Sequence, residues 1–531
     1  MVQGIRGGLP HPLAGLILIA VSVAVFWPVH AFEYINYDDM LYIVDDPVVH
    51  SLGATQFYEL ITQPYQGTYY PVTRLSFAAE NLLSDGGPAV THTVNLVIHG
   101  LNALLLYALL LAFLARFNEQ PKAGADYQLI ALFCALLFAV HPQHVETVAW
   151  SVQRKELLAT FFSLIAIRCH FTGRTIMALG TFLLAVLSKG SAVVVPAMVV
   201  IFDLAWHING KSFLRRIGRS CWNARWLIIV GLAGLVLTLM THRSEDSLYQ
   251  GLFSAPVRAS LLAHNFLEAL GRFLAMQPGL FHQPIEAHIT GMHLRAWVEM
   301  LLACAVIAAA VGALLLGSTT SRWLGAGLLA FGISIVPVGG WVIFGNYAFG
   351  DRYLYLNSIA LYVALAFGCQ HVLITRSPSR RRAWMFSAAV VVVVASLISA
   401  QSVHRFKDSI SLWSAEVSLR PDSVFSNQQL GALLFLAGES DRAQSHFQAS
   451  IESPLEPFRV SSRLASSMYI AEINCRRGKP EQAIEALRRI PSFGGDLGEV
   501  RYLVLSLKHS GLSPCAERIE RWLESQLPRE N

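Results

Sequence analysis

The sequence predicts an all-α integral membrane protein, a bundle of apolar helices followed by a short array of helical repeats. The chain has 531 residues, of which 54% are hydrophobic and 14% are charged. Soluble proteins carry about 25% charged residues, and the mean hydropathy here is +0.47. Charge returns only beyond about residue 403, where the pattern becomes polar and repetitive. We therefore predict a membrane domain over 1–402 and a repeat domain over 403–531.

Eleven apolar runs are candidate membrane spans. A helix that crosses a bilayer needs about 20 apolar residues, and shorter runs must tilt or extend into flanking polar residues. We expect the first run to be a retained helix, because no convincing cleavage site precedes Glu33. The runs cover residues 13–31, 92–114, 128–141, 156–170, 175–188, 191–206, 226–241, 296–316, 323–341, 354–374 and 384–402.

The loop charges predict how these spans are oriented. Short cytoplasmic loops are enriched in Lys and Arg. If the amino terminus is cytoplasmic, alternate loops hold Arg116 and Lys122; Arg168 and Arg174; Lys211, Arg215, Arg216, Arg219 and Arg225; Arg322; and Arg376, Arg380, Arg381 and Arg382. The non-cytoplasmic side then receives the first outer loop 32–91, the stretch 141–156, the outer loop 242–295, the stretch 345–352, the turn 188–191 and the tail. The host membrane is a bacterial inner membrane with a periplasmic tail, or an endoplasmic reticulum membrane with a luminal tail.

The tail carries a pattern typical of tetratricopeptide repeats, which need small residues where their two helices cross. The matching residues are Asn427, Leu430, Gly431, Gly438, Ala443 and Phe447, and the Gly-to-Ala step recurs as Gly478 with Ala483 and Gly511 with Ala516. Successive glycines lie 40 and then 33 residues apart, against a repeat of about 34. We predict two to three repeats, which either bind a protein partner or form a plain helical cap.

Two of the seven cysteines, Cys475 and Cys515, lie in this polar tail. A disulfide between them is possible if the tail lies in an oxidising compartment. Cys134, Cys169, Cys304 and Cys369 lie in or beside apolar runs and are most simply packing residues.

Asp38 and Asp39 are the first candidate catalytic residues, because they follow directly on the first apolar run. A carboxylate in hydrocarbon costs several kcal/mol, so both should face water, a partner or a ligand. The plain alternative is a pair of solvated loop acids.

The stretch 141–156 is the second candidate region. Pro142 should break the third span. Glu146, Trp150 and Arg154 recur at i, i+4 and i+8, so we predict that they share one helical face.

Arg154 and Lys155 fall about two turns into an otherwise apolar helix, where they require an anion. A lipid phosphate, Glu146 or Glu156 could supply it, and a structural salt bridge is the alternative. Lys189, at an outer turn, and the sequence Asp351-Arg352-Tyr353 add charge at the same predicted side. Each alone could be an anchor that snorkels to the interface.

Together these cations would neutralise a lipid-linked phosphate as its bond to a sugar breaks. Asp38 or Asp39 would act as general base toward an acceptor hydroxyl, while His141 and Glu146 would orient the donor or the base. His141 and His144 could ligate a metal, but no third acid follows at metal-site spacing. We therefore predict no metal site and leave a divalent ion open.

The segment 255–295 is partly amphipathic and could lie in the membrane interface. It contains the turn Gln277–Leu280. A helix that covers a loop and a gate for substrate are both consistent with this pattern.

The ordered set of motifs resembles the transmembrane and tetratricopeptide repeat (TMTC) proteins of the GT-C glycosyltransferase superfamily, which are related to protein O-mannosyltransferases. The motifs are Asn36-Tyr37-Asp38-Asp39, Tyr70-Pro71-Val72-Thr73-Arg74-Leu75-Ser76, His92 with Asn95-Leu96 and His99, His141-Pro142 with Val145-Glu146, Val148-Ala149-Trp150, Arg154-Lys155, Leu187-Ser188-Lys189 and Asp351-Arg352-Tyr353-Leu354-Tyr355-Leu356. The resemblance covers nearly the whole chain. The chain departs from it at Gly190-Ser191, where Pro is usual after the lysine, and in its short repeat array.

The resemblance implies transfer of a sugar, typically mannose, from a polyprenyl-phosphate carrier to a protein Ser/Thr or glycan hydroxyl on the non-cytoplasmic side. It implies a base in the first outer loop, which maps to Asp38 or Asp39. One rival interpretation is a non-catalytic membrane scaffold or assembly factor whose repeats recruit partners. Another is a transporter or flippase, which sparse mid-helix charge disfavours. No basic tract with interleaved aromatic residues predicts nucleic-acid binding.

Overall fold

A computed structural model describes residues 10–84, 86–116, 124–206, 213–241, 253–283, 289, 291–341, 349–374, 377–454, 459–488 and 497–526. Every named element in these residues is a helix, so the predicted all-α class is confirmed. The chain divides into two compact units, which meet in sequence at Asp408 and Ser409. Lys122, Lys211 and Arg376, used above to predict the orientation of the spans, lie outside the described residues.

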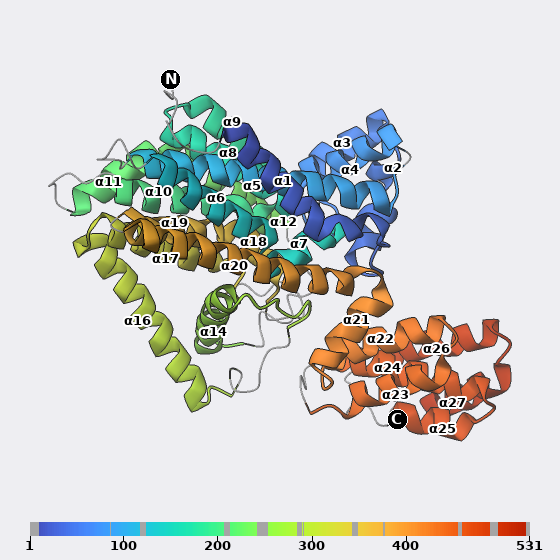
Figure 1. Cartoon of the computed structure of the whole chain (residues 1–531). Helices are drawn as coiled ribbons and strands as arrows, with labels where there is room; N and C mark the ends of the chain where they lie inside the picture. The colour runs from blue at the N-terminus through green and yellow to red at the C-terminus, as the bar shows by residue number, and fades with distance from the viewer. Residues whose placement is uncertain are drawn as a thin grey trace. The chain divides into compact units, whose positions relative to one another are not determined.

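The first unit contains the apolar helices. Its main elements are α1 (His11–Phe26), η1 (Trp27–Ala31), η2 (Met40–Val44), α2 (Pro47–His50), α3 (Ala54–Thr62), α4 (Pro71–Ser84), α5 (Pro88–Arg116), α6 (Gly124–Val140), η4 (Pro142–His144), α7 (Val145–Ala149), η5 (Ser151–Gln153), α8 (Arg154–Phe171), α9 (Thr175–Ser188), η6 (Gly190–Val194), α10 (Val195–Trp206), α11 (Phe213–Asn223), α12 (Arg225–Thr241), α14 (Ala255–Ala275), α16 (Leu294–Leu316), α17 (Thr319–Ile335), η7 (Asp351–Tyr353), α18 (Leu354–Asn357), α19 (Ile359–Ile374), α20 (Pro378–Val403) and η8 (His404–Phe406) (Figure 1).

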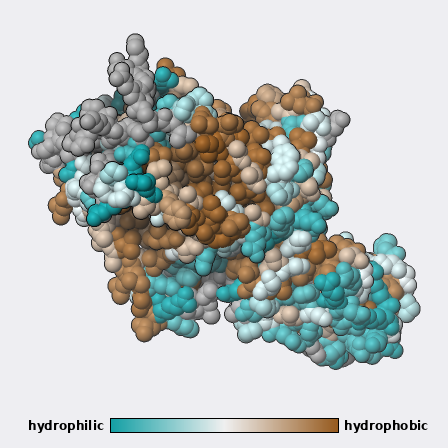
Figure 2. Space-filling view, viewed as in Figure 1, coloured by the Kyte–Doolittle hydropathy of each residue, from teal (hydrophilic) through white to brown (hydrophobic). Residues whose placement is uncertain are grey.

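Several of these helices have the length and composition of membrane spans. Among the described residues, four continuous helices qualify, and the number rises to seven if each of three bent helix pairs is one span. The visible face of this unit is largely hydrophobic in Figure 2. Each of the eleven predicted spans falls on a helix, but the number that cross a membrane stays a prediction.

Two predicted breaks position the residues discussed below. Pro142 has no N–H to continue helix α6, and the chain bends by 49° between the helices on either side of it. At Lys189 the backbone is extended (φ −158°, ψ 127°), which separates α9 from η6. Gly190 is required there, because a Cβ would lie 2.6 Å from the Thr238 hydroxyl.

The second unit consists of α21 (Ser409–Leu419) and three helix pairs, α22 (Val424–Leu436) with α23 (Ser440–Glu452), α24 (Val460–Arg476) with α25 (Pro480–Arg488), and α26 (Leu497–His509) with α27 (Ser513–Gln526). Gly438, Gly478 and Gly511 each end the first helix of a pair with φ between 70° and 83°. Only glycine adopts this left-handed backbone without strain. The paired helices fit the predicted repeats, and their assignment as tetratricopeptide repeats stays a prediction.

The contact between α22 and α23 shows why the pattern requires small residues. Gly431 faces the Phe447 ring, and a Cβ on it would lie 2.7 Å from a ring carbon. Phe447 in turn stacks on Tyr469 of α24, with ring centroids 4.8 Å apart. The second pair is joined to the third by a disulfide between Cys475 and Cys515, which was left open at the sequence level.

We expect the Cys475→Ser/Cys515→Ser variant to destabilise the repeat unit. The bridge closes a segment with a sequence separation of 40 residues, for which the chain-entropy relation gives about 4 kcal/mol. The loss of stability is measured by thermal unfolding of the full chain. Cleavage of the tail by an added protease reports the temperature at which the repeat unit unfolds. An unchanged unfolding midpoint under non-reducing conditions would contradict a bonded pair, and Cys304→Ser is the matched control.

Candidate active site

Asp39 fixes the position of the first loop. Its side chain is fully buried, and its two carboxylate oxygens accept hydrogen bonds from two backbone amides, Ile35 N (2.9 Å) and Val152 N (2.8 Å). Burial raises the pKa of Asp39 to about 7, although both hydrogen bonds oppose the shift. The carboxylate thus joins the loop after α1 to η5, directly before α8, and each of its oxygens accepts a hydrogen bond.

Asp38 has a different environment. Its side chain is half-buried, and no hydrogen bond to it is formed within the described part of the chain. Burial raises the pKa of Asp38 above the ordinary 3.8, and the positive charges of Lys155 and Arg352 oppose this shift. Of the two candidate bases, Asp38 is therefore the carboxylate that is available to accept a proton.

A second buried ion pair holds the far end of the first loop. Arg74 of α4 donates two hydrogen bonds of 2.7 Å to the two oxygens of Asp46. Asp46 also accepts a hydrogen bond from Val48 N at the start of α2 (2.9 Å). The Tyr65 ring lies 4.5 Å from the Arg74 guanidinium. Sequence reasoning missed this pair, although a lone arginine in an apolar helix after an Asp-Pro turn is a usable signal.

Arg154 lies away from Asp38, toward α4 and α5. Its guanidinium is fully buried and forms an ion pair with Glu80 (2.5 Å). It also donates hydrogen bonds to Asn95 Oδ1 and to the Thr91 carbonyl, both 2.8 Å long. These contacts match the structural salt bridge that the sequence left as an alternative, with Glu80 as an acid that was not considered.

The prediction that Glu146, Trp150 and Arg154 share one helical face is wrong. Helix α7 ends at Ala149, the backbone at Trp150 is extended (φ −95°, ψ 118°), and α8 begins only at Arg154. The same break places Arg154 and Lys155 in the first turn of α8 rather than two turns inside it. Spacing by four therefore did not imply a common face.

Lys155 and Lys189 form the cationic side of the site. Within the described residues the Lys155 ammonium has no hydrogen-bonded carboxylate, and it lies 5.2 Å from the centre of the Tyr42 ring. Lys189 forms an ion pair with the buried Glu156 and lies 4.9 Å from the centre of the Tyr353 ring. The charges of the two lysines are close enough to interact with each other.

Arg352 is held by Glu146 from the opposite side. Its guanidinium forms an ion pair with one Glu146 oxygen, and its backbone N–H donates to the other (3.2 Å). It also donates to the Phe281 carbonyl (3.2 Å) and lies 5.4 Å from the Trp150 ring centre. Glu146 therefore orients the cation, and its predicted role in orienting the donor or the base stays a prediction.

Asp351 organises the turn after α14. One oxygen forms an ion pair with Arg272 (2.9 Å) and the other accepts a hydrogen bond from Gly279 N (2.5 Å). Arg405 donates to the Gly279 carbonyl (3.3 Å). A Cβ on Gly279 would lie 1.6 Å from Arg272 Nη1. The turn brings Phe281 against Trp150, with ring centroids 4.7 Å apart.

His141 is buried at the end of α6. Its Nε2 lies 3.1 Å from the Phe273 carbonyl and its Nδ1 accepts a hydrogen bond from Gln143 N (3.3 Å). The structure places these contacts between α6 and α14, so both ring nitrogens are already engaged. His144 is likewise engaged, by the Phe138 carbonyl (2.7 Å) and the Ser358 hydroxyl (3.1 Å).

The structure thus groups the predicted residues into three sets. Asp38, Lys155, Lys189, Glu146 and Arg352 lie together, bordered by the partly exposed rings of Tyr37, Tyr42 and Tyr353. Asp39 and Asp351 hold the surrounding loop and turn. Arg154 and His141 make contacts elsewhere in the unit. Sequence reasoning missed Glu80 and Arg272, because nothing in the sequence near either residue points to its partner.

Comparisons with known proteins give the same family that the motifs suggested. The chain is 20% identical over 491 residues to "Protein O-mannosyl-transferase TMTC3" of Homo sapiens, covering 84% of this chain and 51% of that protein. It is 29% identical over 215 residues to "Protein O-mannosyl-transferase F38B6.6" of Caenorhabditis elegans, covering 38% and 30%. It is 24% identical over 477 residues to Drosophila melanogaster Tmtc3, covering 77% and 50%.

No family model matches the chain. The chain spans 30% to 51% of the length of these curated relatives. The matches to TMTC3 nevertheless run through most of the described helices, and all three relatives carry the same activity in their names. Over most of its length the chain is therefore similar to the animal protein O-mannosyl-transferases of the TMTC group.

Proposed function

We propose that this chain is a membrane glycosyltransferase that moves a sugar, mannose by analogy with its relatives, from a polyprenyl-phosphate carrier to a hydroxyl of a protein. The observation that carries the proposal is Asp38. This half-buried carboxylate, to which no described residue forms a hydrogen bond, interacts with the positive charges of Lys155 and Arg352. This arrangement combines a proton acceptor with charges that suit a phosphate, and a glycosyl transfer from a lipid phosphate needs both.

The proposed step is a direct displacement at the anomeric carbon. Asp38 accepts the proton of the acceptor hydroxyl. The hydroxyl oxygen forms a bond to the anomeric carbon while the bond between this carbon and the phosphate oxygen breaks. The leaving polyprenyl phosphate carries the negative charge, which Lys155, Lys189 and Arg352 neutralise. A guanidinium has five N–H donors and an ammonium three, so pairing with Glu146 or Glu156 leaves donors for the phosphate.

The rings around the site suit a sugar. Tyr37, Tyr42 and Tyr353 each combine an apolar face with a hydroxyl that can form a hydrogen bond. Tyr42 and Tyr353 already lie over the Lys155 and Lys189 ammonium groups. We assign the sugar to the space that these rings border, with Asp39 and Asp351 as positioning residues.

The repeat unit is proposed to lie on the non-cytoplasmic side and to bind the acceptor or a protein partner. The Cys475–Cys515 disulfide supports this location, because such bonds persist in oxidising compartments. The three helix pairs resemble tetratricopeptide repeats, which serve as binding surfaces. A divalent ion has no assigned role in this scheme.

We expect Asp38→Asn to reduce kcat with polyprenyl-phosphate mannose by about 100- to 10,000-fold, the range that a general base supplies. Its unfolding midpoint should stay close to that of the wild type, since the side chain has no hydrogen bond to lose. Asp39→Asn is the matched control. It replaces one acceptor oxygen by an amino group that faces a backbone N–H, at a cost of about 1–3 kcal/mol of stability.

Three results would change this assignment. Turnover that survives Asp38→Asn but collapses in a stably folded Asp39→Asn variant would reverse the two roles. Turnover with another sugar donor only would retain the reaction and replace mannose. A folded protein that turns over no polyprenyl-phosphate sugar, yet binds a partner through residues 409–531, would favour the non-catalytic scaffold.

The pH profile gives a second prediction. Asp38 must be deprotonated to act as base, and its pKa is raised from 3.8 by burial. We therefore expect kcat/KM to fall as pH decreases through a value above 3.8, tenfold for each pH unit below it. Lys155→Gln removes an opposing charge and should move this acid limb to still higher pH.

If the acid limb of the pH profile stays at the same pH in the Lys155→Gln variant, the assignment of Asp38 as the base is contradicted. A measurement of stability against pH distinguishes the titration of Asp39, whose pKa is about 7, from that of Asp38. Its folded-state pKa is raised, so its contribution to stability is present at low pH and is lost as pH rises toward 7. Activity changes in the opposite direction, because kcat/KM rises as pH increases through the pKa of Asp38.

We expect Gly279→Ala to lower turnover at least tenfold. The new methyl group would displace the Arg272 guanidinium from Asp351 and shift the turn that places Phe281 beside Arg352. Overpacking of this kind costs about 1–3 kcal/mol, measurable as a lower unfolding midpoint. Gly271→Ala is the control, because a Cβ there meets no atom within 4 Å. Equal activity of both variants would contradict a role for the turn.

A further inference from the structure

Helix α11 (Phe213–Asn223) has two chemically different faces. The helical spacing places Phe213, Ile217 and Cys221 on one face and Arg215 and Arg219 on the opposite one. The protein covers this apolar face in part, since Ile217 and Cys221 are half-buried, whereas Phe213 is 40% exposed and Leu214, beside it, is 79% exposed. A helix with a basic face and exposed apolar side chains at its start suits the boundary between headgroups and acyl chains.

In the described part of the chain, the arginines at this end of the unit have no acidic partner. None of Arg215, Arg216, Arg219, Arg225 and Arg322 forms an ion pair with a described carboxylate. At the end of the helix, Asn223 donates a hydrogen bond of 3.3 Å to Asp203. Arg216 donates only to the Leu204 carbonyl (2.7 Å), and its Nε has no partner in the described residues. Several unpaired cations in one place attract an anion.

The junction with α12 places aromatic rings beside these charges. The chain bends by 70° between α11 and the apolar helix α12 (Arg225–Thr241). Trp222 and Trp226 are 67% and 48% exposed, and the Arg225 guanidinium lies 4.4 Å and 5.5 Å from their ring centres. Tryptophan and arginine at the end of an apolar helix are typical of the membrane interface. If α12 crosses the bilayer, the bend directs α11 along its surface.

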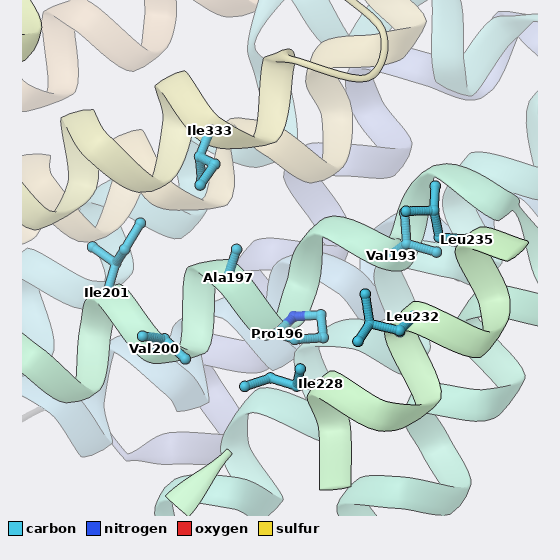
Figure 3. A pocket seen from close by; sticks show the side chains of 10 residues that line it. Val193, Pro196, Ala197, Val200, Ile201, Ile228, Leu232, Leu235 and Ile333 are labelled. Carbon is cyan, nitrogen blue, oxygen red and sulfur yellow. The ribbon is translucent and has the colours of Figure 1, made fainter. Parts of the chain in front are cut away.

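An apolar groove starts one helical turn from these arginines. Its volume is about 330 Å³, and its walls come from η6, α10, α12 and α17 (Figure 3). The lining residues are Val193, Pro196, Ala197, Val200, Ile201, Ile228, Gly231, Leu232, Leu235 and Ile333. Ile201 lies one turn before Leu204, whose carbonyl binds Arg216, and Ile228 lies one turn after Arg225.

We propose that α11 and this groove form a binding site for an anionic phospholipid. The phosphate contacts the arginines of α11 and of the α11–α12 junction, and one acyl chain lies in the groove along α12. The combination of headgroup and acyl-chain contacts distinguishes this site from a general attraction to the membrane surface, because the groove residues Ile201 and Ile228 lie about one helical turn from Leu204 and Arg225. The polar end of the site adjoins α11, whereas the end of the groove near Val193 is the one that approaches Lys189 and the proposed active site.

The test uses the full-length protein in vesicles. A bimane label on Cys221, in a Cys304→Ser background that removes the exposed cysteine, reports contact with lipids whose acyl chains are brominated. We expect brominated phosphatidylglycerol, at a low fraction in phosphatidylcholine, to quench at least about fivefold more effectively than brominated phosphatidylcholine. A basic residue near the surface contributes about 1 kcal/mol to such a preference. Arg215→Gln/Arg219→Gln should reduce the ratio to near one.

Two matched variants separate the parts of the site. Arg380→Gln/Arg382→Gln removes the same charge from exposed arginines at the start of α20 and should leave the ratio unchanged. Ala197→Phe fills the groove and should weaken phosphatidylglycerol quenching several-fold. The label lies on the helix under test, so a measurement without it serves as a control. It records the shift in unfolding midpoint when phosphatidylglycerol is added to unlabelled protein in detergent.

Three outcomes would overturn the proposal. Equal quenching by both lipids would remove the headgroup preference. An equal loss in the α20 variant would reduce the effect to the net charge of the protein. Displacement of brominated phosphatidylglycerol by polyprenyl phosphate, more strongly than by phosphatidylglycerol itself, would assign the groove to the sugar donor.

Discussion

The hydrogen bonds of Asp39 are the contact on which the candidate site depends. A loop that follows a membrane span has no secondary structure of its own to fix it, and a single carboxylate supplies that constraint by binding Ile35 N and Val152 N. Asp38, the preceding residue in the chain, is then held near the first turn of α8. Two amide donors offset part of the cost of burying the Asp39 charge, and the raised pKa of this carboxyl, about 7, shows that burial outweighs them.

The same rule explains the arrangement of the other charges. Arg74 with Asp46, Arg154 with Glu80, Lys189 with Glu156 and Arg352 with Glu146 are each buried in pairs. Lys155 and Asp38 differ, because neither has a hydrogen-bonded partner of opposite charge in the described residues. Leaving Asp38 and Lys155 without such partners costs free energy. A charged ligand that binds beside them would reduce this cost.

Sequence reasoning predicted the elements that depend on local chemistry. Pro142 ended a helix because proline must, and the tail glycines ended helices because their backbone is left-handed. The break at Trp150 could not be predicted, since tryptophan continues a helix as readily as many residues do. The partners of Arg154 and Asp351 also could not, because Glu80 and Arg272 lie far along the chain and only the tertiary fold selects them. The Cys475–Cys515 disulfide could be predicted only in part. The sequence showed that two cysteines were available in the tail, and only the fold showed that they lie close enough to bond.

The long sequence separation of the site contacts has a consequence for biosynthesis. Val152 emerges from the ribosome 113 residues after Asp39, and Arg352 emerges 206 residues after Glu146. Until then Glu146 is a carboxylate in an apolar bundle without its cation, and the first loop has no second anchor. A nascent chain that stalls before α18 would therefore present a carboxylate without its cation, a feature by which quality-control proteases could distinguish it from the finished molecule.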